Sequence, residues 1–438
     1  MSERFARPEA AGLTLICVAM ALVLGACGGD SNGGPPKKVA GGPTASPTPN
    51  PGVAAACVAS GAMGIVVDAA NKNVTVYAPA GDWSETAVTG VFVVPVEGSV
   101  ARATIPTPHI VNSCSGNSVT GTVICDANNS DVYLINGATL TKTVSSVGDS
   151  TADFSGGSCT NCNSEVDPIG VGIIGVARTA APPLLYQFFS LADGSSLGAA
   201  GVPELSESPA VEPNKHWLLS GTEGADYSIV QYGTGVPNVF QFADRAAVIG
   251  GRELDGAAVD CTTDIAVGSV EFTNEMFIAD LTQATFTAGS PGSWAAPGAA
   301  QVQSLADITG ITSTGITVAP SGHVGLMQAE FGGTEFAAFR LPSSSGSGMP
   351  AVQDWVEAAV PAPPSGSWSN TFDPHGVTAY VSPSSGKPMG VLLDASRSFL
   401  AVVDINALLA APRTAGTHTA DPTYNLVTHG VLSFVSVH

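Results

Sequence analysis

The sequence predicts an all-β protein with a β-propeller architecture, and three observations support this fold class. Gly and Pro are abundant, with 51 and 31 residues, while charged residues make up only 12% of the 438-residue chain. That composition is typical of many turns and few exposed helix faces. Short apolar runs alternate with turn residues, and one unit of this kind recurs seven times over residues 57–438 at a spacing of about fifty residues.

Each predicted unit starts with a β-rich run, continues through an acidic or small residue into a turn, and ends in two further apolar strands. The seven residues at this position are Asp68, Asp126, Asp167, Glu212, Asp260, Ala319 and Ser382. Such a unit fits one blade, because the second and third strands are apolar enough to pack on neighbouring blades through both faces. We predict seven blades, although six or eight also fit the pattern.

The end of the chain carries one more apolar run, at residues 431–437. An apolar strand at a terminus needs a partner, and complete closure of the ring removes exposed sheet edges. We therefore expect this last strand to pair with a strand of the first blade.

Three short segments resemble the strand-and-turn repeats of YVTN and NHL-type β-propellers. They are Val-Asp-Pro at 166–168, Val-Ala-Pro-Ser-Gly at 318–322, and Pro-His-Gly-Val at 374–377 followed by Val-Ser-Pro-Ser-Ser-Gly-Lys at 381–387. The chain departs from that pattern in lacking a Tyr-Val-Thr-Asn tetrad and in having Cys261 after Asp260, where Pro is common. The resemblance implies a propeller over residues 57–438 and leaves the subfamily open.

The N-terminus has the features of an export signal. Arg4 and Arg7 precede an apolar run over residues 11–26, which is short for a membrane span. The run ends in Leu-Gly-Ala-Cys at 24–27, which resembles the lipobox of bacterial lipoproteins. The resemblance implies that residues 1–26 are a signal peptide and that Cys27 is lipidated at the new N-terminus. An ordinary secretory signal and an uncleaved anchor are the alternatives.

Residues 27–56 are predicted to form a flexible stalk behind the lipid. They consist mainly of Gly, Pro, Ser, Thr and Ala without apolar periodicity, so they cannot bury enough surface to offset the entropy of ordering. Such a stalk would hold the folded head away from the membrane, unless it packs on the head as a long loop. Gly28 in place of Asp after the cysteine favours the outer membrane by enterobacterial sorting rules.

The formal net charge of −21 argues against nucleic acid as a partner, since such a surface repels phosphate. It favours solubility, and cationic partners or divalent metals also remain compatible with it. No apolar run of about twenty residues follows Cys27, so the head is not expected to cross the membrane.

Six cysteines remain in the head, as expected for disulfides in an oxidising compartment. They are Cys57, Cys114, Cys125, Cys159, Cys162 and Cys261. The sequence does not fix their pairing, although Cys159 and Cys162 are close enough to bridge locally. A redox or zinc role would need a thioredoxin-like context or a second ligand pair, and neither is present.

Two short motifs of the chain occur in enzymes, but neither lies in the structural context that its chemistry requires. The Gly-x-Gly-x-x-Gly pattern at 170–175 lacks the helix that would receive a pyrophosphate, because Pro182 and Pro183 follow it. Ser196 lies in a Gly-x-Ser-x-Gly string with no helix behind it, so we interpret it as a turn residue. We therefore predict no catalytic or cofactor-binding residue.

Two weaker candidates are groups of polar side chains that could contribute to a binding site. Asp126, Asn128 and Asp131 could supply oxygen ligands to calcium, although the EF-hand spacing is absent. Asp373-Pro-His375 is the most suggestive local group for a site assembled at the channel mouth, but we interpret it as a turn that precedes a strand.

The predicted function is that of a lipid-anchored scaffold of the cell envelope that binds a protein, a glycan or another surface component through one end of the propeller. The alternative is a propeller hydrolase or lactonase whose residues converge from several blades at the channel mouth. A fold resemblance alone does not choose between them.

Overall fold

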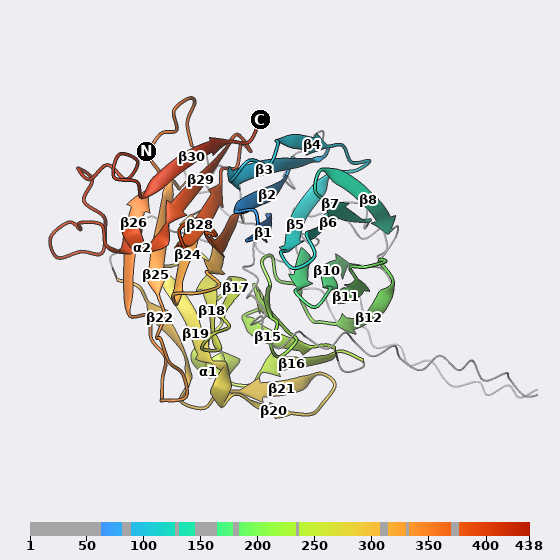
Figure 1. Cartoon of the computed structure of the whole chain (residues 1–438). Helices are drawn as coiled ribbons and strands as arrows, with labels where there is room; N and C mark the ends of the chain where they lie inside the picture. The colour runs from blue at the N-terminus through green and yellow to red at the C-terminus, as the bar shows by residue number, and fades with distance from the viewer. Residues whose placement is uncertain are drawn as a thin grey trace, which may run out of the picture. The chain divides into compact units, whose positions relative to one another are not determined.

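The computed structural model describes residues 63–80, 89–127, 131–144, 164–177, 184–233, 236–306, 314–329, 333–368 and 376–438. These residues form seven sheets that follow one another around a ring, so the predicted seven-bladed β-propeller is confirmed (Figure 1). The predicted signal peptide and stalk lie outside the described residues. Within the described part, no helix has the length and apolar character needed to span a bilayer.

The first three blades each contain four consecutive antiparallel strands, with the first strand innermost. These strands are β1 (Gly64–Asp68), β2 (Asn73–Pro79), β3 (Val91–Glu97), β4 (Ala103–Ile105), β5 (Val111–Asn117), β6 (Thr122–Ala127), β7 (Val132–Asn136), β8 (Thr139–Val144), β9 (Ser164–Asp167), β10 (Val171–Ala177), β11 (Leu184–Ser190) and β12 (Ser196–Gly201).

The last four blades follow the same plan. Their strands are β13 (Ala210–Glu212), β14 (Trp217–Thr222), β15 (Asp226–Gln231), β16 (Asn238–Phe242), β17 (Leu254–Asp260), β18 (Ile265–Val270), β19 (Glu275–Asp280), β22 (Ala300–Ser304), β23 (Thr314–Val318), β24 (Val324–Ala329), β25 (Glu335–Arg340), β26 (Asp354–Ala359), β27 (Val377–Val381), β28 (Pro388–Leu393), β29 (Phe399–Asp404) and β30 (Leu432–Ser436).

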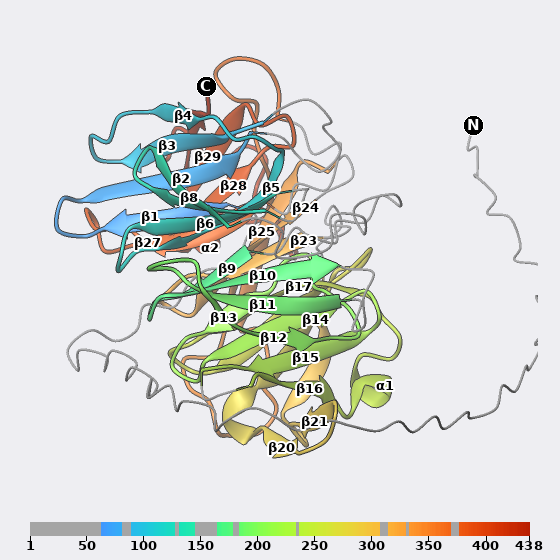
Figure 2. The ribbon, with the colours of Figure 1, turned by 90° about the vertical axis from the view of Figure 1, so that its right-hand side faces the viewer.

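A hairpin extends the sheet of blade 4, although in the chain it lies between the third and fourth strands of blade 5. The hairpin is formed by β20 (Thr285–Thr287) and β21 (Gly292–Ala295), and β21 pairs in parallel with β16. It is preceded by the short η1 (Leu281–Gln283), and α1 (Arg245–Val248) lies nearby, at the end of the ring remote from β3 and β4 (Figure 2). The remaining helix, α2 (Ile405–Leu409), follows β29 in blade 7.

The core lies between the blades, because both faces of each central strand are covered. Every residue of β17 and β18 is buried, and the hydrophobic clusters join consecutive blades. Trp294 of the hairpin is completely buried and packs on the rings of Phe242 and Tyr227, and its indole nitrogen donates a hydrogen bond to the carbonyl oxygen of Tyr227 at 2.7 Å. The apolar second and third strands predicted from sequence are thus explained by packing on two sides.

The inner strands approach one another closely near the channel, and small residues make this approach possible. Gly116 of β5 faces the backbone of β1, where a Cβ atom would lie 2.2 Å from the carbonyl oxygen of Ile65. Only glycine fits there without a shift of the main chain.

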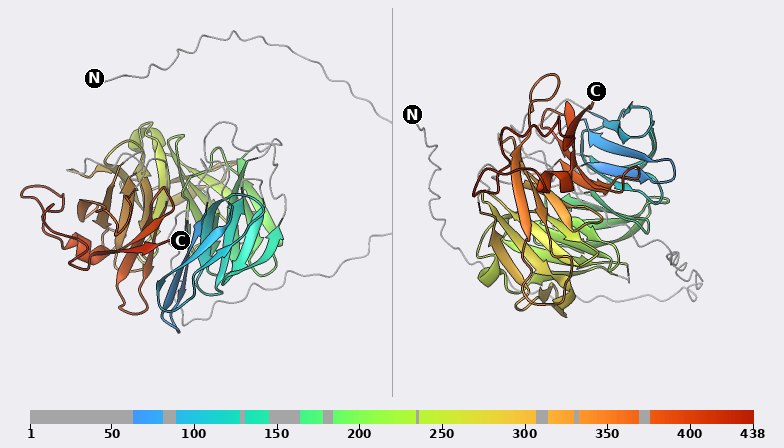
Figure 3. Two further views of the ribbon diagram at one scale, coloured as in Figure 1. Left: turned by 90° about the horizontal axis from the view of Figure 1, so that it is seen from above. Right: turned by 60° about the vertical axis from the view of Figure 1, so that its left-hand side comes forward.

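The predicted closure by the last strand is wrong. β30 pairs with β29, so all four strands of blade 7 come from the C-terminal part of the chain. The red strands of this blade lie beside the blue strands of blade 1 (Figure 3), and an apolar cluster that includes Ile65, Tyr380 and Val437 fills the space between them. The ring therefore closes by side-chain packing, because β29 already supplies the partner that the terminal strand needs.

The second predicted unit is also displaced by one strand. Asp126 lies in β6, the second strand of blade 2, and the inner strand β5 ends instead at Asn117. The polar sequence VNSCSGN does not resemble an inner strand, yet every residue of β5 is buried. Placing Asn117 in the series makes the first steps of the repeat nearly equal, since it lies midway between Asp68 and Asp167.

Candidate functional site

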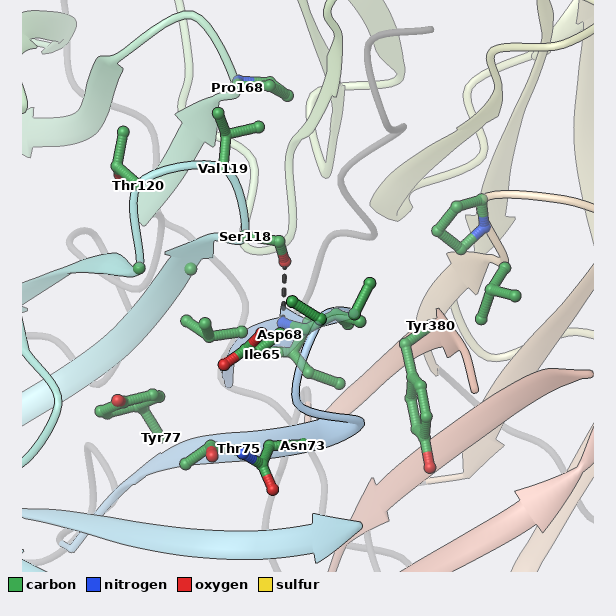
Figure 4. Close-up of a pocket in the computed structure, with 18 of the residues that line it drawn as sticks. Ile65, Asp68, Asn73, Thr75, Tyr77, Ser118, Val119, Thr120, Pro168 and Tyr380 are labelled. Atoms are coloured by element: carbon green, nitrogen blue, oxygen red, sulfur yellow. Dashed lines mark hydrogen bonds between the residues drawn. The ribbon is translucent and has the colours of Figure 1, made fainter. Parts of the chain in front are cut away.

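One cavity occupies the face of the propeller at which the inner strands end. Its volume is about 1030 Å³, and each of the seven blades contributes a residue from the end or the turn of its inner strand. In chain order these residues are Asp68, Ser118, Pro168, Asn214, Thr262, Pro320 and Val381. Figure 4 shows several of them around the opening. We call this cavity the mouth pocket, and it exists only because the turns of all seven blades converge.

The walls of the mouth pocket are largely apolar. Aliphatic side chains of β1 and β27 line it together with the rings of Tyr77 and Tyr380, and Val119 stands at its edge with 64% of its surface exposed. Hydroxyl and amide groups, such as those of Thr75 and Asn136, supply the polar part. An apolar concave surface with a few polar groups is typical of a binding site.

Asp68 is the single carboxylate among the described residues that line the pocket. Its Oδ2 accepts a hydrogen bond from the side-chain amide of Asn71 at 2.7 Å, and its Oδ1 accepts one from the Asn71 backbone N–H at 3.1 Å. These hydrogen bonds, the side-chain one most strongly, lower the pKa of Asp68. No Lys, Arg or His is among the described lining residues, so the pocket carries a net negative charge at neutral pH.

The turns are fastened to one another across the blade boundaries. The hydroxyl oxygen of Ser118 accepts a hydrogen bond from the Val67 N–H at 2.9 Å, which joins blade 2 to blade 1 (Figure 4). The side-chain amide of Asn117 donates to the carbonyl oxygens of Asp167 and Pro168, which joins blade 2 to blade 3. The rim of the pocket is therefore held by hydrogen bonds between neighbouring blades.

Two His–Asp pairs also connect neighbouring blades, at equivalent positions. His216 Nδ1 lies 2.9 Å from Asp167 Oδ2, between blades 4 and 3, and His323 Nδ1 lies 2.6 Å from Asp260 Oδ2, between blades 6 and 5. In each pair the buried Asp ends an inner strand, while the His lies in the first turn of the next blade with a positive φ of 54°. Tyr232 also donates to Asp167, at 2.8 Å.

The pair of His323 and Asp260 lies next to the hydroxyl group of Thr262, but the three residues do not form a catalytic triad of nucleophile, base and acid. Thr262 Oγ1 is 3.2 Å from His323 Nδ1, the same ring nitrogen that contacts Asp260. A relay needs the acid on one ring nitrogen and the nucleophile on the other. Thr262 instead donates to Asp260 at 2.6 Å, as a turn residue does.

The boundary between blades 7 and 1 opens onto the same pocket, since β27 and β1 both line it. Glu97 lies in this boundary and accepts hydrogen bonds from the hydroxyl groups of Tyr380 and Ser382, each at 3.0 Å. Burial, and secondly the charge of Glu97, raise the pKa of the Tyr380 hydroxyl. Arg102 donates to the carbonyl oxygens of Ser436 and His438, which adds a second polar connection.

Comparisons with known proteins show similarity of fold only. No family model matches the chain, and no curated protein matches it. The β-propeller domain of Cps50 (Swd1) from Myceliophteria thermophila is 11% identical, with a TM-score of 0.48 over 76% of this chain and 99% of that one. A chain of the mitotic checkpoint complex is 12% identical, with a TM-score of 0.48 over 79% and 91%. Neither similarity indicates a function for this chain.

The structure places the sequence motifs away from the mouth pocket or in structural roles. Ser196 begins β12, the outermost strand of blade 3, and its hydroxyl oxygen accepts a hydrogen bond from the side-chain amide of Gln187 at 2.6 Å. Gly172 lies in β10, where a Cβ atom would meet the side chain of Ile124 at 2.5 Å, so this glycine serves the packing of blade 3 on blade 2. Asp373 and His375 lie outside the described residues.

The candidate calcium ligands are only partly described. The carboxyl group of Asp126 is buried and directed toward Ser113 of β5, while Asn128 lies outside the described residues. Over the ranges that the structure describes, no group of three or more His, Cys, Asp and Glu side chains is arranged to hold a metal ion.

The six candidate cysteines are only partly described. Cys114 and Cys125 face each other on β5 and β6 and form a disulfide with a Cα–Cα distance of 4.1 Å. Cys261 is also disulfide-bonded. Cys57, Cys159 and Cys162, like the predicted lipidation site Cys27, lie outside the described residues.

Proposed function

We propose that this protein is a lipid-anchored β-propeller of the bacterial cell envelope that binds a partner in the mouth pocket. The observation that carries the binding role is the pocket of about 1030 Å³ to which all seven blades contribute. The anchoring role rests on the apolar run that ends at Cys27 and on the Gly, Pro, Ser and Thr-rich segment behind it. Export to the outer membrane is part of the same proposal.

The chemistry of the pocket favours an uncharged or cationic ligand with apolar surface. Its aliphatic walls would bury apolar groups, while hydroxyl and amide groups would orient hydrogen-bonding ones. The ionised Asp68 and the absence of a basic side chain from the described lining oppose an anion. A segment of an envelope protein with a Lys or Arg side chain, or a neutral glycan, meets these requirements.

A screen of peptide and glycan arrays with the purified head tests the binding role. Val119→Lys places a positive charge at the edge of the pocket, and Leu197→Lys is the matched control, since Leu197 is 50% exposed on the outer strand β12 and does not line the pocket. We expect ligands that are lost with Val119→Lys and retained with Leu197→Lys. Ligands that respond only to the Leu197 change would refute the mouth pocket as the binding site.

The anchor is tested separately, in the exporting bacterium. Mass spectrometry of the mature protein should show a diacylated N-terminal Cys27, and Cys27→Ala should move the protein from the membrane fraction to the soluble fraction. A Cys27→Ala protein that stays processed and membrane-bound would contradict the lipoprotein assignment without affecting the binding proposal.

The two His–Asp pairs at the rim favour a hydrolase or lactonase as the second candidate. A His held by a buried Asp is the arrangement of a general base, and each of these imidazoles is about 30% exposed, with side-chain values of 31% and 28%. Turnover of ester or lactone substrates that is abolished by His216→Gln or His323→Gln, and unchanged by Ser196→Ala, would replace the binding proposal with this one.

A further inference from the structure

A residue with a positive φ closes the turn after the inner strand in blades 2, 4 and 6. His216 and His323 hold this position in blades 4 and 6, directly before β14 and β24, each with a φ of 54°. Gly121 holds it in blade 2, directly before β6, with a φ of 71°. The three residues therefore occupy equivalent places in their blades, but Gly121 has no side chain.

Asp68 is the counterpart of the two carboxylates that these histidines contact. The two carboxylates belong to Asp167 and Asp260, and each of them ends the inner strand of the blade before the histidine. Asp68 ends the inner strand β1 in the same way, in the blade before Gly121. Blade 2 thus offers Asp68 a glycine where blades 4 and 6 offer the preceding carboxylate an imidazole.

The place that an imidazole would fill beside Asp68 belongs to the mouth pocket. The hydrogen bond from the Val67 N–H to Ser118 shows that the turn of blade 2 lies against the end of β1 (Figure 4). Asp68 and Gly121 both line the pocket, and a Cβ atom on Gly121 would meet no atom within 4 Å. A ligand in the pocket can therefore supply the donor that the chain does not supply at this boundary.

The charges around this place favour a cationic donor. Asp68 is the single carboxylate of the described lining, while Lys72, the basic residue of the same turn, does not line the pocket. From blade 7, the ring of Tyr380 lines the pocket, and its hydroxyl group donates to Glu97 at 3.0 Å, so another acidic side chain adjoins the pocket. Carboxylates and aromatic faces both attract cations.

The size and the walls of the pocket indicate what carries the cation. A volume of about 1030 Å³ is much larger than one side chain, and the aliphatic walls from β1 and β27 would bury apolar groups. Lysine combines a compact ammonium group with an apolar four-carbon stem. A lysine with apolar neighbours in an extended segment would therefore match both the carboxylate and the walls.

We propose that Asp68 and the open position at Gly121 form a subsite for the ammonium group of a Lys side chain in a segment of a partner protein. For Asp68, the ammonium group takes the place of the imidazole that blades 4 and 6 supply from their own chain. Apolar residues beside the lysine lie on the aliphatic walls. This inference rests on the proposed function, because it specifies the partner that the mouth pocket binds.

Two labelled peptides test the cation requirement in the full-length protein. One is acetyl-Ala-Leu-Lys-Leu-Ala-amide, and the other has norleucine, an apolar side chain of similar length, in place of the lysine. Fluorescence anisotropy at low ionic strength should show that the Lys peptide binds about tenfold or more tightly than the norleucine peptide. n-Butylammonium should compete only at concentrations far above that of the peptide.

Three results of this titration would overturn the proposal. They are equal binding of the two peptides, no binding of the Lys peptide, and competition by n-butylammonium at the concentration of the peptide, which would assign the subsite to a free amine. The binding role of the pocket is judged separately: array ligands without a basic group that Val119→Lys blocks would leave that role standing while the Lys subsite is refuted.

Gly121→His tests the equivalence of the three turns. It supplies the imidazole that blades 4 and 6 carry, at a positive φ such as their histidines adopt. We expect this variant, like Asp68→Asn, to weaken binding of the Lys peptide about tenfold or more. Gly386→His is the matched control, because Gly386 lies in the corresponding turn of blade 7 with the same φ of 71° and equally open space, and it does not line the pocket.

The control should bind the Lys peptide as the parent does. A crystal structure of the Gly121→His variant gives a readout that needs no peptide, since the new imidazole should lie against the Asp68 carboxylate. An imidazole directed away from Asp68 would refute the equivalence of the turns. Unchanged peptide binding in Asp68→Asn, or an equal loss in Gly121→His and Gly386→His, would refute the subsite.

Discussion

Replacing Asp126 by Asn should remove a large pH-dependent loss of stability from blade 2. Asp126 is 1% exposed in β6, opposite a bulge of β5, where its Oδ1 accepts hydrogen bonds from the Ser113 N–H at 3.0 Å and the Ser113 hydroxyl at 2.5 Å. Burial raises the pKa of this carboxyl from 3.8 to about 7, against the opposing effect of these hydrogen bonds. The Asp126 side chain thus satisfies two hydrogen-bond donors at the bulge, although its charged form is poorly solvated there.

The sign of the effect follows from the raised pKa. The folded protein holds the proton of Asp126 more tightly than the unfolded chain does, so the associated stability is fully present below about pH 3.8 and is lost as the pH rises to about 7. The shift corresponds to about 4 kcal/mol in the free energy of unfolding, of which about 3 kcal/mol falls between pH 4.5 and pH 8.

Asparagine fits the site without a charge. Its Oδ1 can accept both hydrogen bonds from Ser113, and its amide can donate to Asn112 Oδ1, a buried oxygen that has no hydrogen-bond partner in the described structure, once the Asn112 amide rotates. Asp126→Ala is the matched control. It removes the charge but leaves the Ser113 donors unpaired, which costs about 1–3 kcal/mol at every pH.

Urea unfolding of the parent and both variants at pH 4.5 and pH 8 measures these differences. Asp126→Asn should be more stable than the parent at pH 8 and should lose less stability between the two pH values. Glu271, whose pKa is raised to about 8 by burial and by neighbouring Glu side chains, contributes equally to all three proteins. An Asp126→Asn protein with the pH dependence of the parent would refute Asp126 as the source of the pH-dependent loss of stability.

Three further predictions concern the ring. Gly116→Ala should lower the free energy of unfolding by about 1–3 kcal/mol, because its Cβ would meet a carbonyl oxygen of β1, whereas Gly121→Asn, in an open turn with a φ of 71°, should cost much less in the same denaturant titration. Glu97→Ala should cost about 1–3 kcal/mol by leaving two hydroxyls of blade 7 without their acceptor, and a double-mutant cycle would assign this loss to the blade boundary. Deleting residues 428–438 should lower the melting temperature strongly, because it removes β30 and exposes β29. Deleting residues 31–50 should leave the melting temperature nearly unchanged. Equal melting temperatures of both truncations would contradict the assignment of β30 to the fold.

Sequence periodicity predicted the propeller because the second and third strands of each blade carry a clear apolar signal. Asp167 and Asp260 end inner strands as expected, and Ala319 directly follows one. The second predicted unit, which was displaced by one strand, shows which kind of strand lacks this apolar signal. β5 is polar, and several of its buried groups bond to residues outside the strand, such as Asp126 and the Glu165 carboxylate that lies 3.4 Å from Ser115. A pattern that equates burial with apolar residues cannot find such a strand.

The mouth pocket could not be predicted for a different reason. Its lining residues at the ends of the inner strands, such as Asp68, Ser118 and Pro168, are each ordinary turn residues, and successive ones are about fifty positions apart. Only closure of the ring brings them together. The His–Asp pairs are separated in the same way, by 49 and 63 positions, so no linear motif marks them.

The way in which the blade edges are covered explains how the ring closes without a shared blade. The β20–β21 hairpin of blade 5 covers the outer strand of blade 4, and a loop of blade 6 covers β22 of blade 5 through the Gln303 side chain, which accepts from the Val352 N–H at 2.8 Å. A segment of blade 7 covers β26 through the Glu357 backbone, which exchanges hydrogen bonds of 3.0 and 2.8 Å with His418 and Ala420.

Blade 1 continues this series across the junction of the chain ends, where Arg102 contacts carbonyl oxygens at the end of blade 7. In each case the next blade in the ring protects the edge of the one before it, so an exposed edge is removed locally, without a strand exchanged between the termini. The terminal strand can therefore stay in blade 7. Closure of the ring then depends on side chains such as Glu97 and Arg102, which is why changes at this boundary should reach the mouth pocket that blades 1 and 7 both line.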